Sequence, residues 1–445
     1  MDTHIVISLI GIIVSIVVMI FLAYRGVGIY VYTILAAMIV IAFSGQPFIS
    51  ALTENFMTGF TSFAKNYFLL LGLSATFAQL MGVSGAARRI AQTILKLAGK
   101  NEDNQSWFRP MFCIMMIPFF MTLGGISTFI VVFLVADIAR NIYQKLDIPW
   151  HMYFCGSWAS ATMTMTMIPG TPSIQNIIPT NYLGTTTTAA PFLGIISAVI
   201  CLILEICYIQ RQIRKAKKRD EHFLPSGVEY RKMTEQDNPP EDISFFKAIL
   251  PSVFLLVMLN VPAFGRSPIQ ALLVANVACM ILFYKHFTLK RIASALQTGV
   301  ENSSKAVIGT SCIVGFGSCV SATAGYAAIV TSLNNLTVNP LIQIVIVTNV
   351  LAGITGSSSG GLTMCLNDFA ERFIQSGVNP QIIHRIAAIA SGGLDSVPHS
   401  SAVNIGLQIT GLNHNNAYRH FFWCCTAIPL IVLMIAVILA SMGVC

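Results

Sequence analysis

The strongest constraint in this sequence is a series of apolar stretches about as long as a bilayer is thick. A helix that crosses the hydrocarbon core needs about 20 predominantly apolar residues. Uninterrupted runs that approach this length are 5–23, 27–44, 66–83, 190–209, 246–262, 268–284 and 422–443. Further apolar segments contain glycine, proline, serine or threonine breaks, namely 108–136, 151–184, 306–332, 340–366 and 384–412. The sequence therefore predicts an all-α polytopic membrane protein with at least about ten membrane segments.

The distribution of charge excludes a water-soluble protein. Only 44 of the 445 residues are charged, and 16 of these lie between Arg211 and Lys247. Soluble domains are about a quarter charged, whereas the other 408 residues carry 28 charges. A soluble enzyme, a nucleic-acid-binding protein and a disordered scaffold are therefore excluded. The cysteines are scattered through apolar stretches without a C-x-x-C pair or a Cys/His metal spacing, so we expect no cofactor and no metal site.

A polar stretch near the middle divides the chain into two membrane halves. Most residues of 211–219 are basic and directly follow an apolar run, an arrangement that the positive-inside rule assigns to the cytoplasm. We expect a first membrane repeat over 1–210, a cytoplasmic linker over 211–245 and a second repeat over 246–445. With the linker inside, the two halves begin on opposite sides of the bilayer, which is typical of inverted-topology repeats.

A faint internal similarity supports the repeat. Residues 136–151 align with residues 367–382 at four identical positions of sixteen. A glycine pair precedes each copy, and a proline-centred polar break follows each copy. Paired interruptions at matching places in two halves are the best sequence indication of a transport site.

The first polar break, Thr162 to Thr188, contains the core sequence IPGTPSIQN (168–176). Unwound backbone at membrane depth is tolerated only inside protein or beside a watery cavity. Thr171-Pro172 has the form of a helix N-cap followed by proline at the first helical position, and a helix N-terminus favours an anion. The alternative is a kink in a structural helix. The predicted substrate-binding residues here are Thr171, Ser173 and Asn176.

The second polar break is SGGLDSVPHSSAVN (391–404), where Asp395 or Ser396 is the expected cap of a helix that begins near Pro398. Ionisable residues in an apolar segment are costly to bury and mark functional sites, so Asp395 and His399 are the predicted proton-coupling residues. The structural alternative is that Asp395 only caps the helix. Neither break contains an obvious basic side chain, so backbone dipoles are expected to bind the anion. The predicted substrate-binding residues here are Ser396, Ser400, Ser401 and Asn404.

A third element, GITGSSSGG (353–361), is the expected tip of a re-entrant hairpin. Its predicted substrate-binding residues are Ser358, Ser359 and Gly360, and close helix contact through small residues is the alternative. Its counterpart in the first half, Thr122 to Thr128, is a weaker pattern. The sequence indicates no partner for His151, His384, His414 or His420, and Glu205 is interpreted as interfacial because the basic cluster follows one turn later.

These segments resemble those of a known family. SGGLDSVPHSSAVN (391–404) resembles the GLD-x-[LV]-PH segment of the gluconate permease (GntP) family within the ion transporter superfamily, and PGTPSIQNIIPT (169–180) is similar to the first-half motif of some members. The resemblance spans essentially the whole chain. It implies a proton-driven symporter for small organic monocarboxylates, with paired re-entrant hairpins, an elevator-type movement and often a dimer.

Two departures from the family pattern bear on the substrate. Many members have Asn-Gly where this chain has Ser400-Ser401, and gluconate-type members carry an Asp where this chain has GGIST (124–128). Both departures argue against gluconate itself, so the expected substrate is a gluconate-like acid or a shorter hydroxy acid such as 3-hydroxybutyrate or lactate.

The expected function is proton-coupled symport of a small organic monocarboxylate across the bacterial inner membrane. Sodium coupling is the alternative, with carbonyls and hydroxyls of 355–361 and 162–171 holding the ion. Paired asymmetric breaks suit alternating access better than a passive channel, and no HExxH, GxSxG or paired-aspartate motif indicates an intramembrane enzyme. The expected partners are the acid, the proton and the lipid bilayer, but no nucleic acid; a homodimer is left open.

Overall fold

The structure is a computed structural model that describes residues 2–97, 107–123, 128–224, 226, 242–260, 267–335 and 338–445. Within these ranges the chain forms helices and turns and no strand, so the predicted all-α class is confirmed. Five of the described helices are long and apolar enough to cross a bilayer by length and composition: Thr3–Tyr24, Phe48–Ser84, Pro191–Lys218, Leu289–Ser321 and His414–Ser441. Shorter apolar helices account for three further uninterrupted runs (Ile29–Ser44, Phe245–Leu255 and Pro268–Leu282) and for parts of three interrupted segments (Phe108–Leu123, Ala324–Leu333 and Pro340–Thr355).

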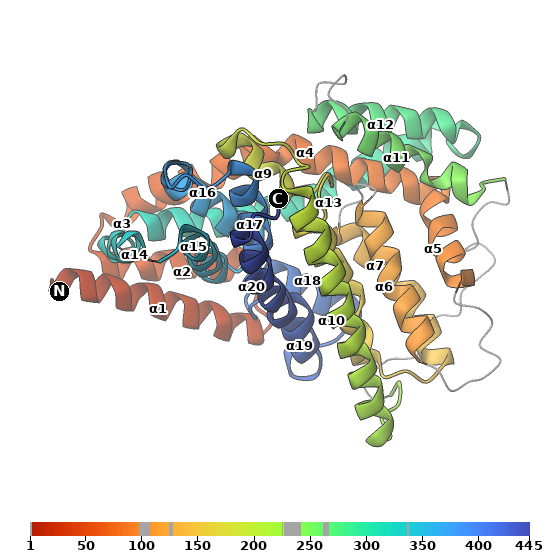
Figure 1. Ribbon diagram of the computed structural model, residues 1–445, viewed down its shortest axis with the longest axis horizontal. Coiled ribbons are helices and arrows are strands. Elements are labelled where there is room, and N and C mark those ends of the chain that lie inside the picture. Colours follow the sequence, from red (N-terminus) through yellow and green to blue (C-terminus); the bar gives the residue numbers. More distant parts are fainter. Residues whose placement is uncertain are drawn as a thin grey trace.

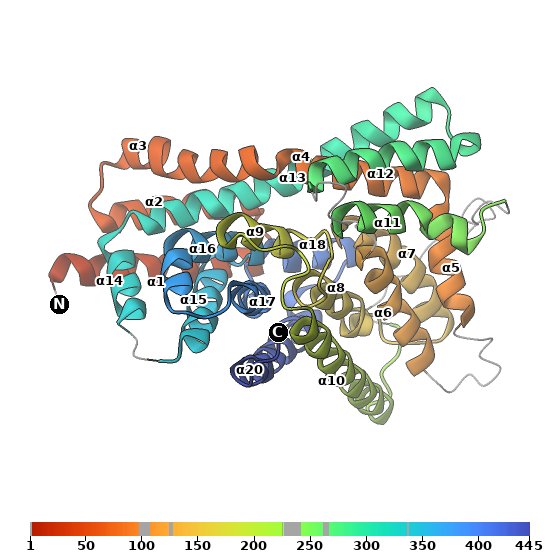
Figure 2. The same cartoon turned by 45° about the horizontal axis from the view of Figure 1, so that its top comes forward.

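One group of helices is built around two very long ones that lie side by side (Figures 1 and 2). A continuous helix runs from α3 (Phe48–Ser50) through a π-helical segment (Ala51–Phe56) into α4 (Met57–Ser84). Its neighbour is α13 (Leu289–Ser321), and a Cβ on Gly299 of α13 would lie 2.7 Å from the Cα of Thr76. This glycine therefore allows the two backbones to approach closely.

The other members of this group flank the two long helices. Helix α2 (Ile29–Ser44) lies beside one end of α13, and α1 (Thr3–Tyr24) packs against α2 and contacts α14 (Ala324–Asn334). At the other end, α12 (Pro268–Leu282) contacts α4, and α11 (Phe245–Asn260) contacts both α12 and α5 (Ala86–Leu97). A short 3-10 turn, Tyr284–His286, connects α12 to α13.

A second group contains the helical hairpins and the broken helices. In the first half it consists of α6 (Phe108–Leu123), α7 (Thr128–Lys145), the 3-10 segment Trp150–Cys155, α8 (Ser157–Thr166), α9 (Ile174–Leu183) and α10 (Pro191–Lys218). In the second half it consists of α15 (Pro340–Thr355), α16 (Ser358–Gln375), α17 (Pro380–Ser391), α18 (Ser401–Thr410), α19 (His414–Phe422), a π-helical segment (Trp423–Ala427) and α20 (Ile428–Ser441). Both halves therefore run in the same order, from a hairpin through a broken helix pair to a long helix.

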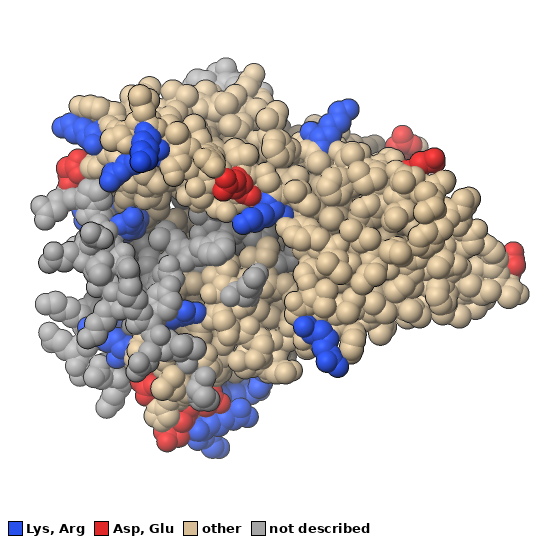
Figure 3. All heavy atoms as spheres, turned by 180° about the vertical axis from the view of Figure 1, so that it is seen from behind, with Lys and Arg blue, Asp and Glu red and all other residues tan. Residues whose placement is uncertain are grey.

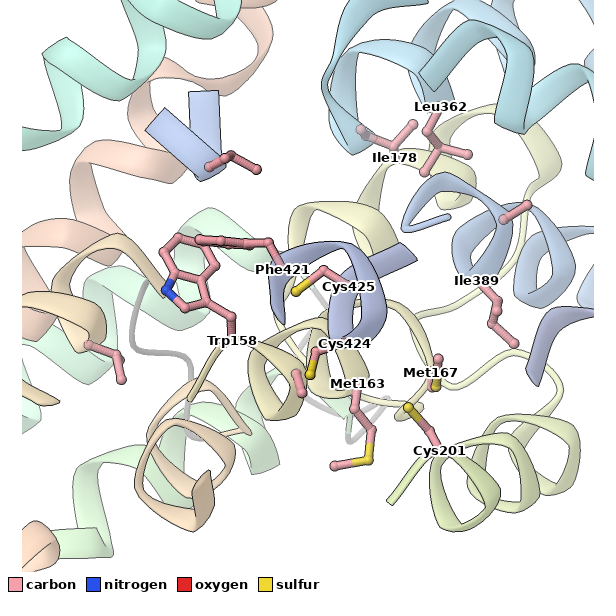
Figure 4. Packing of buried hydrophobic residues seen from close by; sticks show 14 of the residues in the cluster. Trp158, Met163, Met167, Ile178, Cys201, Leu362, Ile389, Phe421, Cys424 and Cys425 are labelled. Atoms are coloured by element: carbon pink, nitrogen blue, oxygen red, sulfur yellow. The ribbon is translucent and has the colours of Figure 1, made fainter. Parts of the chain in front are cut away.

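The two halves share one buried core in this second group (Figure 4). The indole of Trp158 on α8 and the ring of Phe421 on α19 have centroids 5.1 Å apart. Cys424 and Cys425 lie next to these rings, and Cys201 of α10 lies near Met163 and Met167. All the cysteines are free and most are buried, so they act as small apolar side chains in this fold.

Charged residues occupy few places on the surface. Figure 3 shows a face that is mostly uncharged, with Lys, Arg, Asp and Glu gathered in separate clusters. Many large apolar side chains point outward, including Ile13, Val17 and Phe21 on one face of α1, which are each more than half exposed. A wide apolar exterior of this kind suits a lipid environment rather than water.

Three helix boundaries differ from the sequence-based expectation. The helix of the first break is capped by Ser173 and begins at Ile174, so the prediction of Thr171-Pro172 as cap and first residue is wrong. The helix of the second break begins at Ser401 instead of near Pro398. Finally, α10 continues to Lys218, so the first part of the predicted linker is helical.

The segment that follows α10 folds back against the protein. Phe223 is only 3% exposed and its ring lies 6.2 Å from that of Trp150. His222 Nδ1 lies 2.6 Å from Asp147 Oδ2, and the Phe223 amide donates to Asp147 Oδ1 at 2.9 Å. The start of the linker is therefore docked. Residues 227–241, the hairpin tip 124–127 and the side chain of Ser401 lie outside the described part of the chain.

Candidate functional site

Both breaks and the α15–α16 hairpin tip border a single cavity of about 160 Å³. Its polar wall includes six of the predicted site residues: Ser173, Ser358, Ser359, Asp395, Ser396 and Ser400. Its opposite wall comes from the long-helix group and includes Phe63, Leu70 and Leu71 of α4, Leu272 of α12 and Thr310 of α13. The cavity therefore lies where the two helix groups meet.

Three helices begin at this cavity. The Ser173 hydroxyl caps α9 by accepting from the Asn176 amide, and the Ser357 hydroxyl caps α16 by accepting from the amide of Gly360. First-turn residues of both helices, Gln175 and Ser358 among them, line the cavity. The third helix, α18, begins at Ser401, between two residues of the cavity wall, Ser400 and Ala402.

These helix starts give the cavity an anion-binding character. The first amides of a helix have no partner within the helix, and the helix dipole places partial positive charge there. A direct contact joins two of the starts, because Gln175 Nε2 on α9 donates to Ser358 Oγ on α16 at 2.7 Å. Amide groups from α9 and α16, which come from different halves of the chain, are thus held next to one another.

Asp395 is the only ionisable side chain among the described residues of the cavity wall. The Ser396 hydroxyl donates to its Oδ1 at 2.9 Å, and the Ser358 side chain lies within hydrogen-bonding reach of the same carboxyl group. The carboxyl group of the second break is therefore connected to the start of α16. No basic side chain lines the described wall, as the sequence indicated.

The first break is held by a buried arginine that sequence reasoning missed. Arg385 on α17 is completely buried, and its Nη1 donates to Asn176 Oδ1 at 2.7 Å. Nη2 donates to the carbonyls of Ala189 at 2.9 Å and Thr187 at 3.2 Å, while Nη1 reaches the Thr166 carbonyl at 3.5 Å. This guanidinium fastens the end of α8, the start of α9 and the loop before α10 to a helix of the other half.

Thr171 and Asn176 lie behind the cavity wall. Asn176 Nδ2 donates to Thr171 Oγ1 at 2.6 Å and to the Ile168 carbonyl at 3.0 Å. The Thr171 hydroxyl donates to the Thr164 carbonyl at 3.0 Å. Both side chains are buried and their hydrogen-bonding capacity is used inside the break. The structure thus places these two predicted substrate-binding residues where they shape the loop that carries Ser173.

Aromatic and imidazole groups hold the carbonyls of the second break. The Tyr32 hydroxyl donates to the His399 carbonyl at 2.6 Å, and the Tyr418 hydroxyl donates to the Ser396 carbonyl at 3.1 Å. His414 Nε2 donates to the Pro398 carbonyl at 3.0 Å, and Asn404 Nδ2 donates to the Ser400 carbonyl at 2.8 Å. Asn404 therefore stabilises the start of α18 from outside the cavity wall.

His399 lies directly beneath the hairpin tip. Gly356 has a φ of +59°, and a Cβ at this position would lie 2.6 Å from Cδ2 of His399. Only glycine fits both the left-handed backbone and this close approach. The structure places the His399 side chain against the tip residue instead of on the cavity wall. Gly360 also lies off the wall, within the first turn of α16.

Comparison with known proteins places the chain in a family. The model of the GntP family permeases matches residues 7–443. The chain belongs to the GntP permease family. It is also similar to a curated relative, the uncharacterized transporter YxjC of Bacillus subtilis (strain 168), with 30% identity over 459 aligned positions that cover 93% of this chain and 95% of the relative.

The fold of this GntP permease is similar to that of a solved transporter. The crystal structure of the Alcanivorax borkumensis YdaH transporter, described as revealing an unusual topology, aligns with a TM-score of 0.57. The alignment covers 93% of this chain and 98% of that chain at 12% sequence identity. At this identity the similarity concerns the fold alone.

Proposed function

We propose that this permease is a secondary active transporter that carries a small organic monocarboxylate together with a proton. The observation that carries the proposal is the meeting of three helix N-termini and one carboxyl group in a cavity with no basic side chain on its described wall. Exposed amides and helix dipoles suit a single negative charge of modest binding strength. The proposal assigns the cavity to transport rather than to catalysis.

The serine hydroxyls around the cavity would form hydrogen bonds with the hydroxyl groups of the substrate. Ser173, Ser358, Ser359, Ser396 and Ser400 are distributed over both breaks and the hairpin tip, so a hydroxy acid can be contacted from several sides. Ser401, which follows Ser400, is proposed to contribute as well. The apolar residues of α4 would face the hydrocarbon part of the acid. Gluconate and shorter hydroxy acids both suit this arrangement.

Asp395 is the proposed proton-coupling residue. It lies on the cavity wall beside the anion-binding amides, so an ionised Asp395 would repel the bound carboxylate and a protonated one would not. Binding of the acid and uptake of a proton would therefore favour one another, which is the requirement for symport. His399 would assist by fixing the hairpin tip against the second break.

We further propose that the two halves are inverted repeats and that the broken-helix group moves against the long-helix group as an elevator. The shared order of elements supports the repeat, and the position of the cavity between the two groups supports the movement. The basic end of α10 supports a cytoplasmic linker in a bacterial inner membrane. A homodimer through the long-helix group would provide a fixed scaffold.

Transport by purified protein in liposomes tests the proposal. A panel of gluconate, lactate and 3-hydroxybutyrate would be offered under an imposed pH gradient, with and without sodium. We expect accumulation of at least one acid driven by the pH gradient in sodium-free buffer. Accumulation that requires sodium would show that sodium, and not the proton, is the coupling ion. The absence of transport of every acid would refute the proposed substrate class.

A further inference from the structure

A continuous chain of polar side chains leads from the docked linker into the second helix group. Glu221 Oε2 lies 3.1 Å from His151 Nε2, and His151 Nδ1 lies 3.0 Å from His420 Nε2. His420 Nδ1 is in turn 3.0 Å from the Tyr208 hydroxyl and 3.2 Å from Cys155 Sγ. The imidazole rings of His151 and His420 are stacked with an interplanar angle of 7°.

One set of tautomers satisfies every contact from Glu221 to Tyr208. His151 Nε2–H donates to the Glu221 carboxylate, and His151 Nδ1 accepts from His420 Nε2–H. His420 Nδ1 then accepts from the Tyr208 hydroxyl. Each imidazole therefore has one donor and one acceptor nitrogen, both engaged. An uninterrupted series of this kind is suited to passing a proton by successive transfers.

A buried carboxyl group lies one helical turn from the inner end of the chain. Glu205 is 2% exposed and lies one helical turn before Tyr208 on α10. Neither of its oxygens has a hydrogen-bond partner in the described part of the chain, although the Cys424 thiol lies near it. Glu205, interpreted from the sequence as interfacial, is thus buried inside the protein. A buried ionisable group in a membrane segment marks a functional site, and proton relays are one use of such carboxyl groups.

The chain runs from water into the interior. The side chains of Glu221 and His151 are 29% and 21% exposed, whereas His420 is 4% exposed. Within the described residues no group of three His, Cys, Asp or Glu side chains has the geometry of a metal site. The charged and titratable groups around the chain are Arg219, Lys215 and Arg419, together with Cys155, Cys201, Cys424 and Cys425.

Further groups lie between Glu205 and the cavity. Glu205 interacts electrostatically with the thiol of Cys425, and that thiol is within hydrogen-bonding reach of the Thr162 hydroxyl. Thr162 belongs to the cavity wall. Glu205 thus lies between the candidate substrate site and the surface chain that begins at the linker.

We infer that Glu205, His420, His151 and Glu221 form a proton relay that releases the coupled proton on the linker side. Once its carboxyl group turns toward Tyr208, one helical turn away, protonated Glu205 gives its proton to the Tyr208 oxygen as the Tyr208 O–H proton passes to His420 Nδ1. His420 Nε2–H passes its proton to His151 Nδ1, and His151 Nε2–H passes its proton to Glu221, which loses it to water. The transfers move one proton from Glu205 to the linker side and leave both imidazoles in the opposite tautomer, with the proton on Nδ1. This inference rests on the proposed proton coupling.

Infrared spectroscopy of the purified protein in liposomes tests the relay without any substrate. The carbonyl band of protonated Glu205 is identified as the band that Glu205→Gln removes, and its shift after transfer to D₂O reports how fast the proton exchanges with water. We expect His420→Gln to slow this exchange at least about tenfold. His286→Gln is the matched control, because His286 contacts Asp242 at 3.0 Å outside the relay.

Transport measurements give the second readout. Glu205→Gln and His420→Gln should reduce proton-driven accumulation of the transported acid at least about tenfold, while exchange of acid across the membrane, which needs no net proton release, stays within about twofold. Equal loss of accumulation and exchange, an unchanged exchange rate of the carbonyl band in His420→Gln, or the absence of a Glu205 carbonyl band would each overturn the relay. If wild-type protein transports none of the acids, the proposed function fails, whereas the infrared test of the relay still gives its answer.

Discussion

The most informative single perturbation of the site is Arg385→Lys. It keeps a basic side chain at this buried position and removes the planar guanidinium, whose several N–H donors point in different directions. The guanidinium satisfies four oxygens on three segments: those of Thr166, Asn176, Thr187 and Ala189. A lysine ammonium is a single point and cannot span them. The Thr187 carbonyl also accepts from the Gly170 amide at 2.9 Å, so if the ammonium reaches one of the other three oxygens, two buried acceptors lose their donor at about 1–3 kcal/mol each. The folded state should therefore be destabilised by about 2–6 kcal/mol.

Thermal denaturation of the detergent-solubilised protein measures this effect. We expect the apparent Tm of Arg385→Lys to fall by several degrees, and the half-saturation concentration for the transported acid to rise because the loop that carries Ser173 loses its anchor. Arg25→Lys is the matched control, since Arg25 is exposed and its guanidinium lies over the Phe21 ring. An Arg385→Lys protein with wild-type Tm and half-saturation would refute the assigned role.

Three further predictions concern the second break, the hairpin tip and the linker. Asp395→Asn should abolish pH-driven accumulation while leaving exchange of acid measurable in liposomes; normal accumulation would contradict its coupling role. Gly356→Ala should lower transport and apparent Tm more than Gly377→Ala. Both glycines have a positive φ, which costs about 1–2 kcal/mol for alanine, but only at Gly356 would the added Cβ meet the His399 ring. Equal effects of the two substitutions would argue against that contact. The hydrogen bond that His222 donates to the Asp147 carboxylate raises the pKa of His222, so the docked segment should be held below that raised pKa and loosen as pH rises through it. Limited proteolysis within the linker should then be faster at about pH 9 than at about pH 6, and His222→Gln should remove the difference.

Much of the architecture was predictable because lipid permits few solutions. Apolar length predicted the helices, and the two proline-containing breaks predicted where regular backbone ends at the cavity. The cap of α9 was misplaced by two residues because Thr171-Pro172 and Ser173 both have the composition of a helix start. Which of the two residues caps α9 depended on the Thr164 carbonyl, because it accepts a hydrogen bond from the Thr171 hydroxyl.

Other features depended on contacts between distant segments. Arg385 lies within an otherwise regular α17, and its partners come from residues about 200 positions earlier in the chain. His151 and His420 are likewise 269 positions apart. A possible signal was present, since an arginine and isolated histidines in apolar helices must find polar partners. The sequence did not indicate which partners these were.

A structure of the protein with a saturating concentration of a transported acid would show where the substrate carboxylate binds. We expect the carboxylate within about 3 Å of first-turn amides of α9, α16 or α18, beside Asp395 and away from any lysine or arginine side chain. A carboxylate bound elsewhere, or one held by a basic side chain, would contradict this expectation.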